Sequence, residues 1–204
     1  MRAATSDTCV LLVRHGETSE TAERRYPSAR DLPLSEQGRA QAVALARALQ
    51  DVAVDAVFTS ESRRARETAE LLVSGRDRSL QVLPEVAEMR FGRLGGLTIE
   101  EAAQAFPEVF RGWHDNPFAV TPPDGEPFLD FIGRVRRTRI QLSRAWAGRT
   151  IAVVTHGGVI CAWRCLEEGR PWEDFWQAIP APGTGVWLIR AGGQVRVETL
   201  RPEG

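Results

Sequence analysis

The sequence predicts an α/β fold built around a mostly parallel sheet. Three short apolar runs, at residues 8–13, 55–59 and 150–155, have the length and composition of buried strands. The last of them, "TIAVVT", is continuously apolar between its two threonines, which is typical of a strand covered on both faces. Segments with helical spacing of apolar residues separate these runs, and strands that alternate with helices favour a parallel sheet.

The first half of the chain is predicted to contain two strand–helix units. Ser35 is a preferred N-cap residue, and apolar side chains at helical spacing share one face of the segment that follows it. After the strand at 55–59, either Ser60 or Ser62 is expected to cap a second helix, which extends to about Val73.

The second half continues the alternation, with loops rich in glycine and proline between the elements. In chain order we expect a strand near 80–83 ending at Pro84, a Gly-rich loop at 91–97, a helix capped by Thr98 and interrupted at Pro107, an irregular segment at 114–127, an amphipathic helix from Phe128 to Trp146, a helix at 158–166, and edge strands near 185–190 and 195–199. The four prolines of 114–127 exclude regular structure there.

Length and composition limit the classes of protein that the chain can form. The 204 residues are expected to make one domain, 1–204, in which 1–7 are frayed and 107–127 form a lid-like insertion. The formal net charge of −1 gives no overall field that favours nucleic acid or an anionic membrane. No apolar run resembles a signal segment or a membrane span, and three cysteines form no CxxC pair, so we expect a cytoplasmic protein with reduced thiols. The sequence does not determine the oligomeric state, and a homodimer is one of the options.

Reactive side chains follow three of the predicted strands. Arg14 and His15 follow the first, Ser60 and then Arg64 follow the second, and His156 follows the third. Because open parallel sheets bind ligands outside the carboxyl ends of their strands, we expect these residues to meet at one edge. Taken singly, each also fits a structural role: a surface turn for Arg14 and His15, a solvated helix face for Arg64, and a helix start for His156.

Five short motifs occur in a fixed order along the chain. They are "RHGET" at 14–18, "LSEQGRAQA" at 34–42, "SESRRARETA" at 60–69, "EMRFGRLGGLT" at 88–98 and "VVTHGG" at 153–158. Together they make residues 9 to about 160 resemble the histidine phosphatase superfamily. The resemblance implies a phosphoglycerate-mutase-like fold, a three-layer α/β/α sandwich with a mostly parallel sheet. It also implies a phosphomonoesterase that acts on a small phosphorylated metabolite.

The same resemblance implies roles for two residues in the chemical steps. His15 would be the nucleophile that forms a phosphohistidine, which water then hydrolyses. Glu88 would protonate the leaving alcohol and later take a proton from water. Glu17 and Glu85 are the competing carboxylates, and both are expected to lie in turns instead.

Several residues are expected to bind the phosphoryl group. By the resemblance they are Arg14, Arg64, His156, Gly16 and Thr21, with His156 cationic. The cations would supply the positive charge that a metal ion brings to phosphoryl transfer, so neither a metal nor another cofactor is expected. Thr21 stands where many members carry asparagine, and its hydroxyl is expected to donate one hydrogen bond to phosphate.

The segment that is expected to meet the leaving group and the loop after Glu88 depart from the family pattern at a few positions. "GWHDNPFAVTPPDGEPFLDFIGRV" is similar to the corresponding segment of bacterial α-ribazole phosphatases and broad-specificity members, which usually have Gly-Glu-Ser where this chain has Gly125-Glu126-Pro127. Leu94-Gly95-Gly96 stands where Trp-Glu-Gly is frequent, which removes bulk from the pocket wall. The substrate pocket is expected to include Arg90, Phe91, Trp113 and Phe118, with His114 exposed to solvent.

Three other functions compete with phosphatase. A cofactor-dependent phosphoglycerate mutase would have a longer insertion than the 67 residues between Glu88 and His156, and a tyrosine in place of Phe91. An iron site of His15, His156 and Glu88 would repel the nearby arginines. A non-catalytic phosphate-binding module would usually lack the nucleophile or the acid, and this chain has both.

Overall fold

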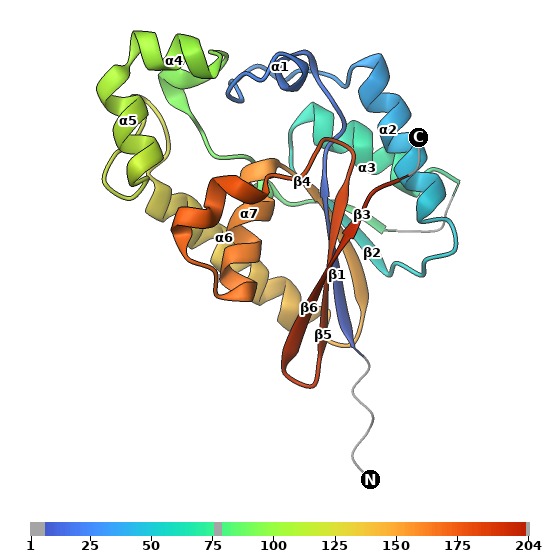
Figure 1. Ribbon diagram of the computed structural model, residues 1–204. Coiled ribbons are helices and arrows are strands. Elements are labelled where there is room, and N and C mark those ends of the chain that lie inside the picture. Colours follow the sequence, from blue (N-terminus) through green and yellow to red (C-terminus); the bar gives the residue numbers. More distant parts are fainter. Residues whose placement is uncertain (1–6, 76–78, 203–204) are drawn as a thin grey trace.

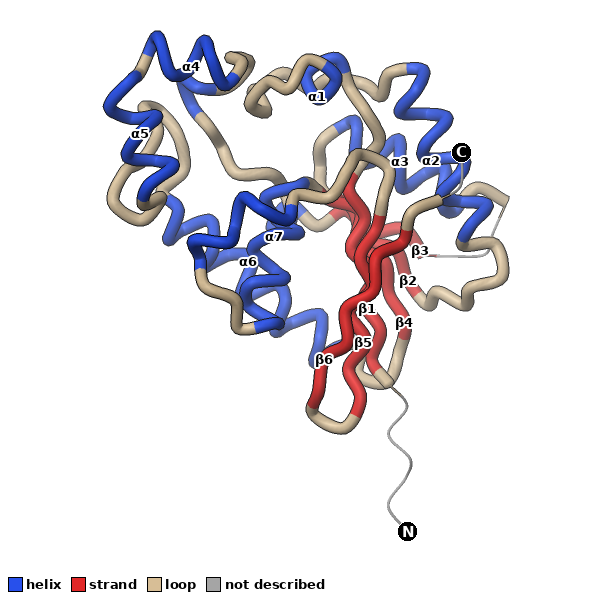
Figure 2. Tube along the Cα trace, viewed as in Figure 1, coloured by secondary structure: helices blue, strands red, loops and turns tan. Residues whose placement is uncertain are grey.

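The computed structural model describes residues 7–75 and 79–202, and its six strands form one sheet (Figures 1 and 2). The strands are β1 (Thr8–Arg14), β2 (Ala56–Thr59), β3 (Ser79–Val82), β4 (Thr150–Thr155), β5 (Gly185–Ala191) and β6 (Gln194–Leu200). Their order across the sheet is β3-β2-β4-β1-β5-β6. The first four in that order are parallel, and β5 and β6 form an antiparallel hairpin at one side. The prediction of a mostly parallel sheet is confirmed.

Seven α-helices and three 3₁₀ segments connect these strands within the described residues. They are α1 (Ser19–Ala22), α2 (Glu36–Ala48), α3 (Arg63–Val73), η1 (Pro84–Val86), η2 (Gly92–Leu94), α4 (Ile99–Ala105), α5 (Pro107–Asp115), α6 (Phe128–Ala145), α7 (Gly157–Glu168) and η3 (Trp172–Ala178). The expected strands and longer helices are therefore present at close to their predicted bounds. The short helix α1 and the segment η3 were not predicted, because neither is long enough to show a period in the sequence.

The alternation of side chains along β1 explains the layers. Leu11 and Val13 pack in a core cluster with residues of α2 and α3, whereas Val10 and Leu12 belong to the cluster formed with α6 and α7. Successive residues of a strand point to opposite faces, so each face of the sheet is covered by its own pair of helices. Figure 2 shows the strands between these two helical layers. The three-layer α/β/α sandwich is confirmed.

The loop between α5 and α6 differs in part from the prediction. Helix α5 includes His114 and Asp115, so the irregular segment begins at Asn116 rather than at residue 114. Pro107 does end one helix and begin the next, since it occupies the first position of α5. Trp113 is completely buried, which anchors α5 in the core. Of the segment expected to be frayed, residues 1–6 lie outside the described residues.

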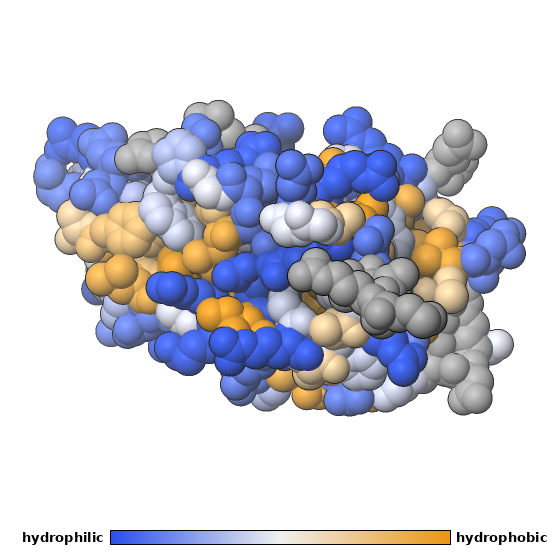
Figure 3. Space-filling view, turned by 90° about the horizontal axis from the view of Figure 1, so that it is seen from below, coloured by the Kyte–Doolittle hydropathy of each residue, from blue (hydrophilic) through white to orange (hydrophobic). Residues whose placement is uncertain are grey.

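The face drawn in Figure 3 carries both hydrophilic and hydrophobic side chains, and the hydrophobic ones form one larger area at the left of the view and smaller groups elsewhere. The described helices include none with the length and hydropathy needed to cross a membrane. Cys9, Cys161 and Cys165 are free thiols, as expected, and the latter two are buried.

Two glycines allow the first strand and helix α2 to approach closely. A Cβ atom at Gly38 would lie 2.1 Å from the carbonyl oxygen of Glu17, and one at Gly16 would lie 2.3 Å from the carbonyl oxygen of Gly38. Both distances are far inside van der Waals contact, and both obstacles are backbone atoms. The close approach fixes the loop that directly follows β1.

We predict that Gly38→Ala lowers the free energy of unfolding by about 1–3 kcal/mol, the usual cost of overpacking a tight site. Gly133→Ala is the matched control, because it also replaces a helical glycine but meets only the guanidinium end of Arg137, at 3.3 Å. That control should be neutral or stabilising by up to about 1 kcal/mol, since alanine is the better helix former. Denaturant melts of both variants measure the difference, and equal effects would contradict the packing argument.

Candidate active site

Three parallel strands bring the predicted site residues to one edge of the sheet. In the register of the sheet, Arg14 at the end of β1 pairs with Thr155 at the end of β4, and β2 ends at Thr59 beside Val154. The next residues continue this alignment, because the backbone N–H of His15 donates to the carbonyl of Thr155 at 3.0 Å. The expected meeting of two histidines and two arginines is therefore observed.

His15 is buried, and a short hydrogen bond fixes its imidazole ring. Its Nδ1 lies 2.7 Å from the carbonyl oxygen of Gly16, which can only accept, so Nδ1 carries the proton. The lone pair is then on Nε2, and Nε of Arg64 donates to that atom at 3.2 Å. Burial, together with the charge of Arg64, holds the pKa of His15 well below its ordinary value. The ring is therefore neutral, with Nε2 facing the arginine.

His156 lies beside His15, with their ring centroids 5.1 Å apart. Its Nε2 is 2.8 Å from Ser60 Oγ and 3.1 Å from Ser62 Oγ, and its Nδ1 is 3.5 Å from Nη2 of Arg64. Burial and the charge of Arg64 lower the pKa of His156 well below its ordinary value. These surroundings favour a neutral ring, whereas the sequence had led us to expect a cation.

The two arginines, Arg14 and Arg64, both line the pocket beside His15. Arg64 is 7% exposed, so it does not lie on a solvated helix face. Arg14 donates through Nη1 to the carbonyl oxygen of Pro180 at 2.7 Å, and its buried Nε has no hydrogen-bond partner among the described residues. Burial lowers the pKa of both guanidinium groups, which nevertheless stay protonated. Arg14 therefore retains an uncommitted donor at the site.

Glu88 is held against the first turn of α7. Its Oε2 accepts a hydrogen bond from the backbone N–H of Gly158 at 3.1 Å, and its Oε1 accepts one from Met89 at 3.0 Å. A Cβ atom at position 158 would lie 2.5 Å from Oε1 of Glu88, so only glycine permits this contact. The competing Glu17 instead accepts from Ser35 Oγ at 2.8 Å.

A buried ion pair fixes the segment that carries Glu88. Arg134 of α6 donates to the carbonyl oxygens of Glu85, Ala87 and Glu88 and pairs with the carboxylate of Glu126 at 2.8 Å. The sequence did not reveal this contact. The available signal was an arginine next to the apolar stripe of α6, but the three carbonyl groups that it binds lie 46 to 49 residues away.

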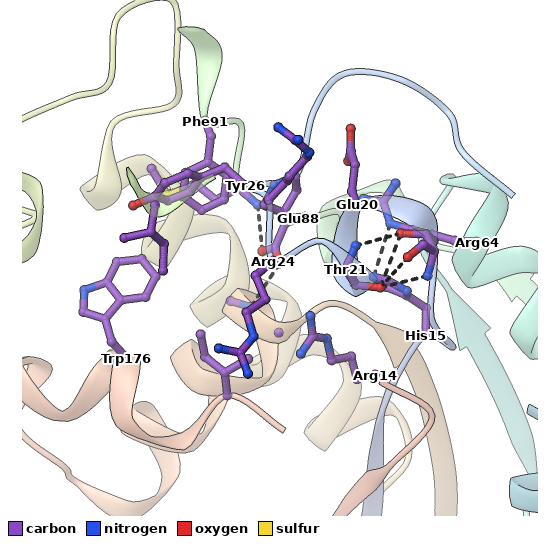
Figure 4. Close-up of a pocket in the computed structure, with 18 of the residues that line it drawn as sticks. Arg14, His15, Glu20, Thr21, Arg24, Tyr26, Arg64, Glu88, Phe91 and Trp176 are labelled. Carbon is purple, nitrogen blue, oxygen red and sulfur yellow. Dashed lines mark hydrogen bonds between the residues drawn. The ribbon is translucent and has the colours of Figure 1, made fainter. Parts of the chain in front are cut away.

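A pocket of about 410 Å³ opens in front of these residues (Figure 4). Figure 4 shows His15, Arg14 and Arg64 on one side of it and the rings of Tyr26, Phe91 and Trp176 on the other. Its apolar wall consists of Tyr26, Met89, Phe91, Ile99, Phe131, Phe175, Trp176 and Ile179. One part of the pocket is thus charged and the other is largely aromatic.

Only some of the four residues that were predicted to form the substrate pocket line it. Phe91 lines the pocket, and Arg90 lines a neighbouring depression that also reaches Arg64 and Glu88. Trp113 lies behind the wall, where its ring packs edge-on against those of Phe91 and Phe128. Phe118 lies outside the pocket lining and packs on the rings of Phe128 and Trp172.

A hydrogen bond joins two pocket residues that lie far apart in the sequence. The hydroxyl of Tyr26 is 3.0 Å from Nε2 of His114. His114 is exposed, as expected, but it also lines the pocket. Burial raises the pKa of Tyr26 to about 12, so its hydroxyl stays protonated. Tyr26 and Trp176 were not predicted from the sequence, because neither belongs to a motif with reactive side chains.

Two predicted phosphate contacts have other partners in this structure. The hydroxyl of Thr21 lines the pocket, donates to the carbonyl of Thr18 at 3.0 Å and accepts from the N–H of Thr18 at 2.8 Å, which completes a capping box. The N–H of Gly16 donates to Thr68 Oγ1 at 3.1 Å. Glycine at position 16 is required by the approach of Gly38 described above.

The arrangement does not support a metal centre. In residues 7–75 and 79–202, no three His, Cys, Asp or Glu side chains form a group that could hold a metal ion. The iron-site alternative therefore lacks a set of ligands in the described geometry.

Comparison with known proteins decides the family. The family model described as "Histidine phosphatase superfamily (branch 1)" matches residues 10–201. The chain belongs to the histidine phosphatase superfamily. It is 34% identical to the adenosylcobalamin/α-ribazole phosphatase of Escherichia coli strain K12 over 165 residues, which covers 81% of each chain.

Two further relatives support the same assignment. The chain is 30% identical to phosphoserine phosphatase 1 of Hydrogenobacter thermophilus, with coverage of 82% of this chain and 79% of the relative. The solved structure of the α-ribazole phosphatase from Shigella flexneri superposes with a TM-score of 0.84 at 30% identity, and covers 94% of this chain and 95% of that one. The chain is a histidine-type phosphatase with the phosphoglycerate-mutase-like fold.

Proposed function

We propose that the protein is a phosphomonoesterase that hydrolyses a small phosphorylated metabolite through a phosphohistidine intermediate on His15. The observation that carries this proposal is the hydrogen bond from Nδ1 of His15 to the carbonyl oxygen of Gly16. It leaves the Nε2 lone pair as the nucleophile and directs it toward the guanidinium of Arg64. A neutral imidazole attacks phosphorus directly, without first losing a proton.

The first step transfers the phosphoryl group to the enzyme. Nε2 of His15 forms a bond to phosphorus while the bond from phosphorus to the ester oxygen breaks. Glu88 gives its proton to that oxygen, so the leaving group departs as a neutral alcohol. Arg14, Arg64 and His156 offset the negative charge on the equatorial phosphoryl oxygens.

The second step releases phosphate and restores the enzyme. Glu88, now a carboxylate, takes a proton from water as the water oxygen bonds to phosphorus. The bond from phosphorus to Nε2 of His15 breaks, and the neutral imidazole returns. No metal ion is required in this scheme, since the two guanidinium groups provide the positive charge that a metal would supply.

The pocket indicates the kind of leaving group. Its aromatic wall, formed by Tyr26, Phe91, Phe131, Phe175 and Trp176, favours a ring or another flat apolar part. The hydrogen-bonded pair of Tyr26 and His114 provides a polar contact at the same wall. A ring-bearing ester is therefore a better match to this pocket than a small amino acid ester.

We predict that the purified protein releases inorganic phosphate fastest from phosphate monoesters whose leaving group carries a ring. The measurement is phosphate release across a panel of phosphorylated metabolites that includes α-ribazole phosphate, phosphoserine and 3-phosphoglycerate. Conversion of 3-phosphoglycerate to its isomer without phosphate release would instead identify a mutase. The absence of turnover on every ester would leave only phosphate binding and would refute the proposal.

We predict that Glu88→Gln slows the hydrolysis of alkyl phosphates by about 10²–10⁴-fold, the usual contribution of general acid catalysis. It should leave p-nitrophenyl phosphate nearly unaffected, because nitrophenolate departs without a proton. Initial rates on both kinds of ester measure this split.

The matched control for this variant is Glu85→Gln. Glu85 is exposed and contributes its carbonyl oxygen, not its carboxylate, to the contact with Arg134. That variant should hydrolyse both kinds of ester at the original rates. If Glu88→Gln slows alkyl and nitrophenyl esters by the same factor, Glu88 positions the substrate and the acid is another residue.

A further inference from the structure

Ser62 occupies the N-cap position of α3 but does not cap that helix. Its side chain makes no capping hydrogen bond, although serine is among the preferred residues at this position. The first N–H of the helix, from Arg63, donates instead to Oδ1 of Asp31 at 2.6 Å. A carboxylate from another loop therefore lies at the helix start, and the hydroxyl of Ser62 makes its contacts elsewhere.

That contact is with His156. Ser62 Oγ lies 3.1 Å from Nε2 of His156 and 2.8 Å from Ser60 Oγ, and Ser60 Oγ lies 2.8 Å from the same Nε2. Two hydroxyl groups thus meet one ring nitrogen. Ser60 is fully buried, whereas Ser62 lines the neighbouring depression.

The other ring nitrogen determines where the proton lies. Nδ1 of His156 faces Nη2 of Arg64 at 3.5 Å, and the same guanidinium donates to Nε2 of His15 at 3.2 Å. An arginine can only donate, so this contact favours the tautomer with the lone pair on Nδ1 and the proton on Nε2. Phosphoryl oxygens can only accept. His156 must therefore gain a proton on Nδ1 before it can donate to a phosphoryl group on this side.

We infer that Ser62 is a positioning residue for His156. Together with Ser60 it accepts the proton of Nε2, which keeps Nδ1 turned toward Arg64 and His15 and stabilises the imidazolium that forms when a tetrahedral anion binds. The step is a single proton transfer, in which Nδ1 takes one proton from solvent and Nε2 keeps its own. The inference rests on the proposed function, because it takes the space beside Arg64 as the phosphoryl site.

The charged groups around His156 explain why such an acceptor matters. Those whose charge acts on it are Arg64 of α3, Arg14 at the end of β1 and Arg134 of α6, and the ring of His15 lies beside it. Burial and these groups all hold the pKa of His156 down. The hydroxyl oxygens of Ser60 and Ser62 oppose that effect, since hydrogen bonds that involve a charged group are stronger than neutral ones.

Sulfate binding tests the inference without any need for turnover. Sulfate is a tetrahedral dianion that does not titrate near neutral pH, so the pH dependence of its affinity there reports proton uptake by the protein. Titration calorimetry in two buffers of different ionisation enthalpy measures the affinity and the number of protons taken up. For the original protein we expect binding to take up one proton at neutral pH and to weaken as the pH rises.

In Ser62→Ala we expect about tenfold weaker sulfate binding at neutral pH, the usual effect of losing a hydrogen bond to a charged group. The pH at which sulfate binding weakens should move lower, because the imidazolium is less stable. Ser62→Thr keeps the hydroxyl and should restore both values. The melting temperature of Ser62→Ala should stay unchanged, since the hydroxyl of Ser62 makes no capping hydrogen bond.

The matched control is Ser35→Ala, which removes a hydroxyl that does cap its helix, through the N–H of Gly38 at 3.0 Å. It should lower the melting temperature and leave the pH dependence of sulfate binding in place. Equal sulfate binding by the original protein and Ser62→Ala, or a Ser62→Thr variant as weak as Ser62→Ala, would overturn the inference. A protein that shows the sulfate effect but hydrolyses no ester would refute the proposed function and leave this inference standing.

Discussion

The hydrogen bond between Nδ1 of His15 and the carbonyl oxygen of Gly16 is the interaction on which the rest of the site depends. It decides which nitrogen carries the proton, and so which one faces Arg64. The bond exists because the backbone after β1 is held in one path by the close approach of Gly38 and by the hydrogen bond from Gly16 N–H to Thr68. The packing between the end of β1 and α2 thus determines which nitrogen of the His15 imidazole carries the proton.

The charges of the site are arranged to suit an anion. Two neutral histidines lie among the guanidinium groups of Arg14 and Arg64, which are themselves largely buried. Placing cations in such surroundings is unfavourable until a negative group joins them. The carboxyl group of Glu88 lies beside this cluster, against the start of α7, where the backbone N–H of Gly158 donates to it. The negative charge of an incoming phosphoryl group would therefore compensate the positive charge of Arg14 and Arg64.

The sequence predicted the features that local patterns encode. Apolar runs and caps located the strands and longer helices, and the rule on parallel strands correctly placed His15, Arg64 and His156 at one edge. The sequence could not predict contacts between segments that lie far apart in the chain. Asp31 accepts from the first N–H of α3, Arg134 binds the loop of Glu88, and Tyr26 bonds to His114, which lies 88 residues further along the chain. Each of these contacts depends on tertiary packing, which no local period in the sequence reveals.

The same limit explains where single-residue predictions about the pocket differed from the geometry. Aromatic residues near a proline-rich loop were expected to face the leaving group, but Trp113 fills the core behind Phe91 instead. Composition alone does not distinguish an aromatic side chain that lines a pocket from one that supports its wall. The central claim, that Nε2 of His15 attacks phosphorus, is tested most directly by rapid quenching of the reaction with a ³²P-labelled ester. We expect an acid-labile label on His15 that is absent from His15→Ala, and label that persists in that variant on His156 would contradict the account.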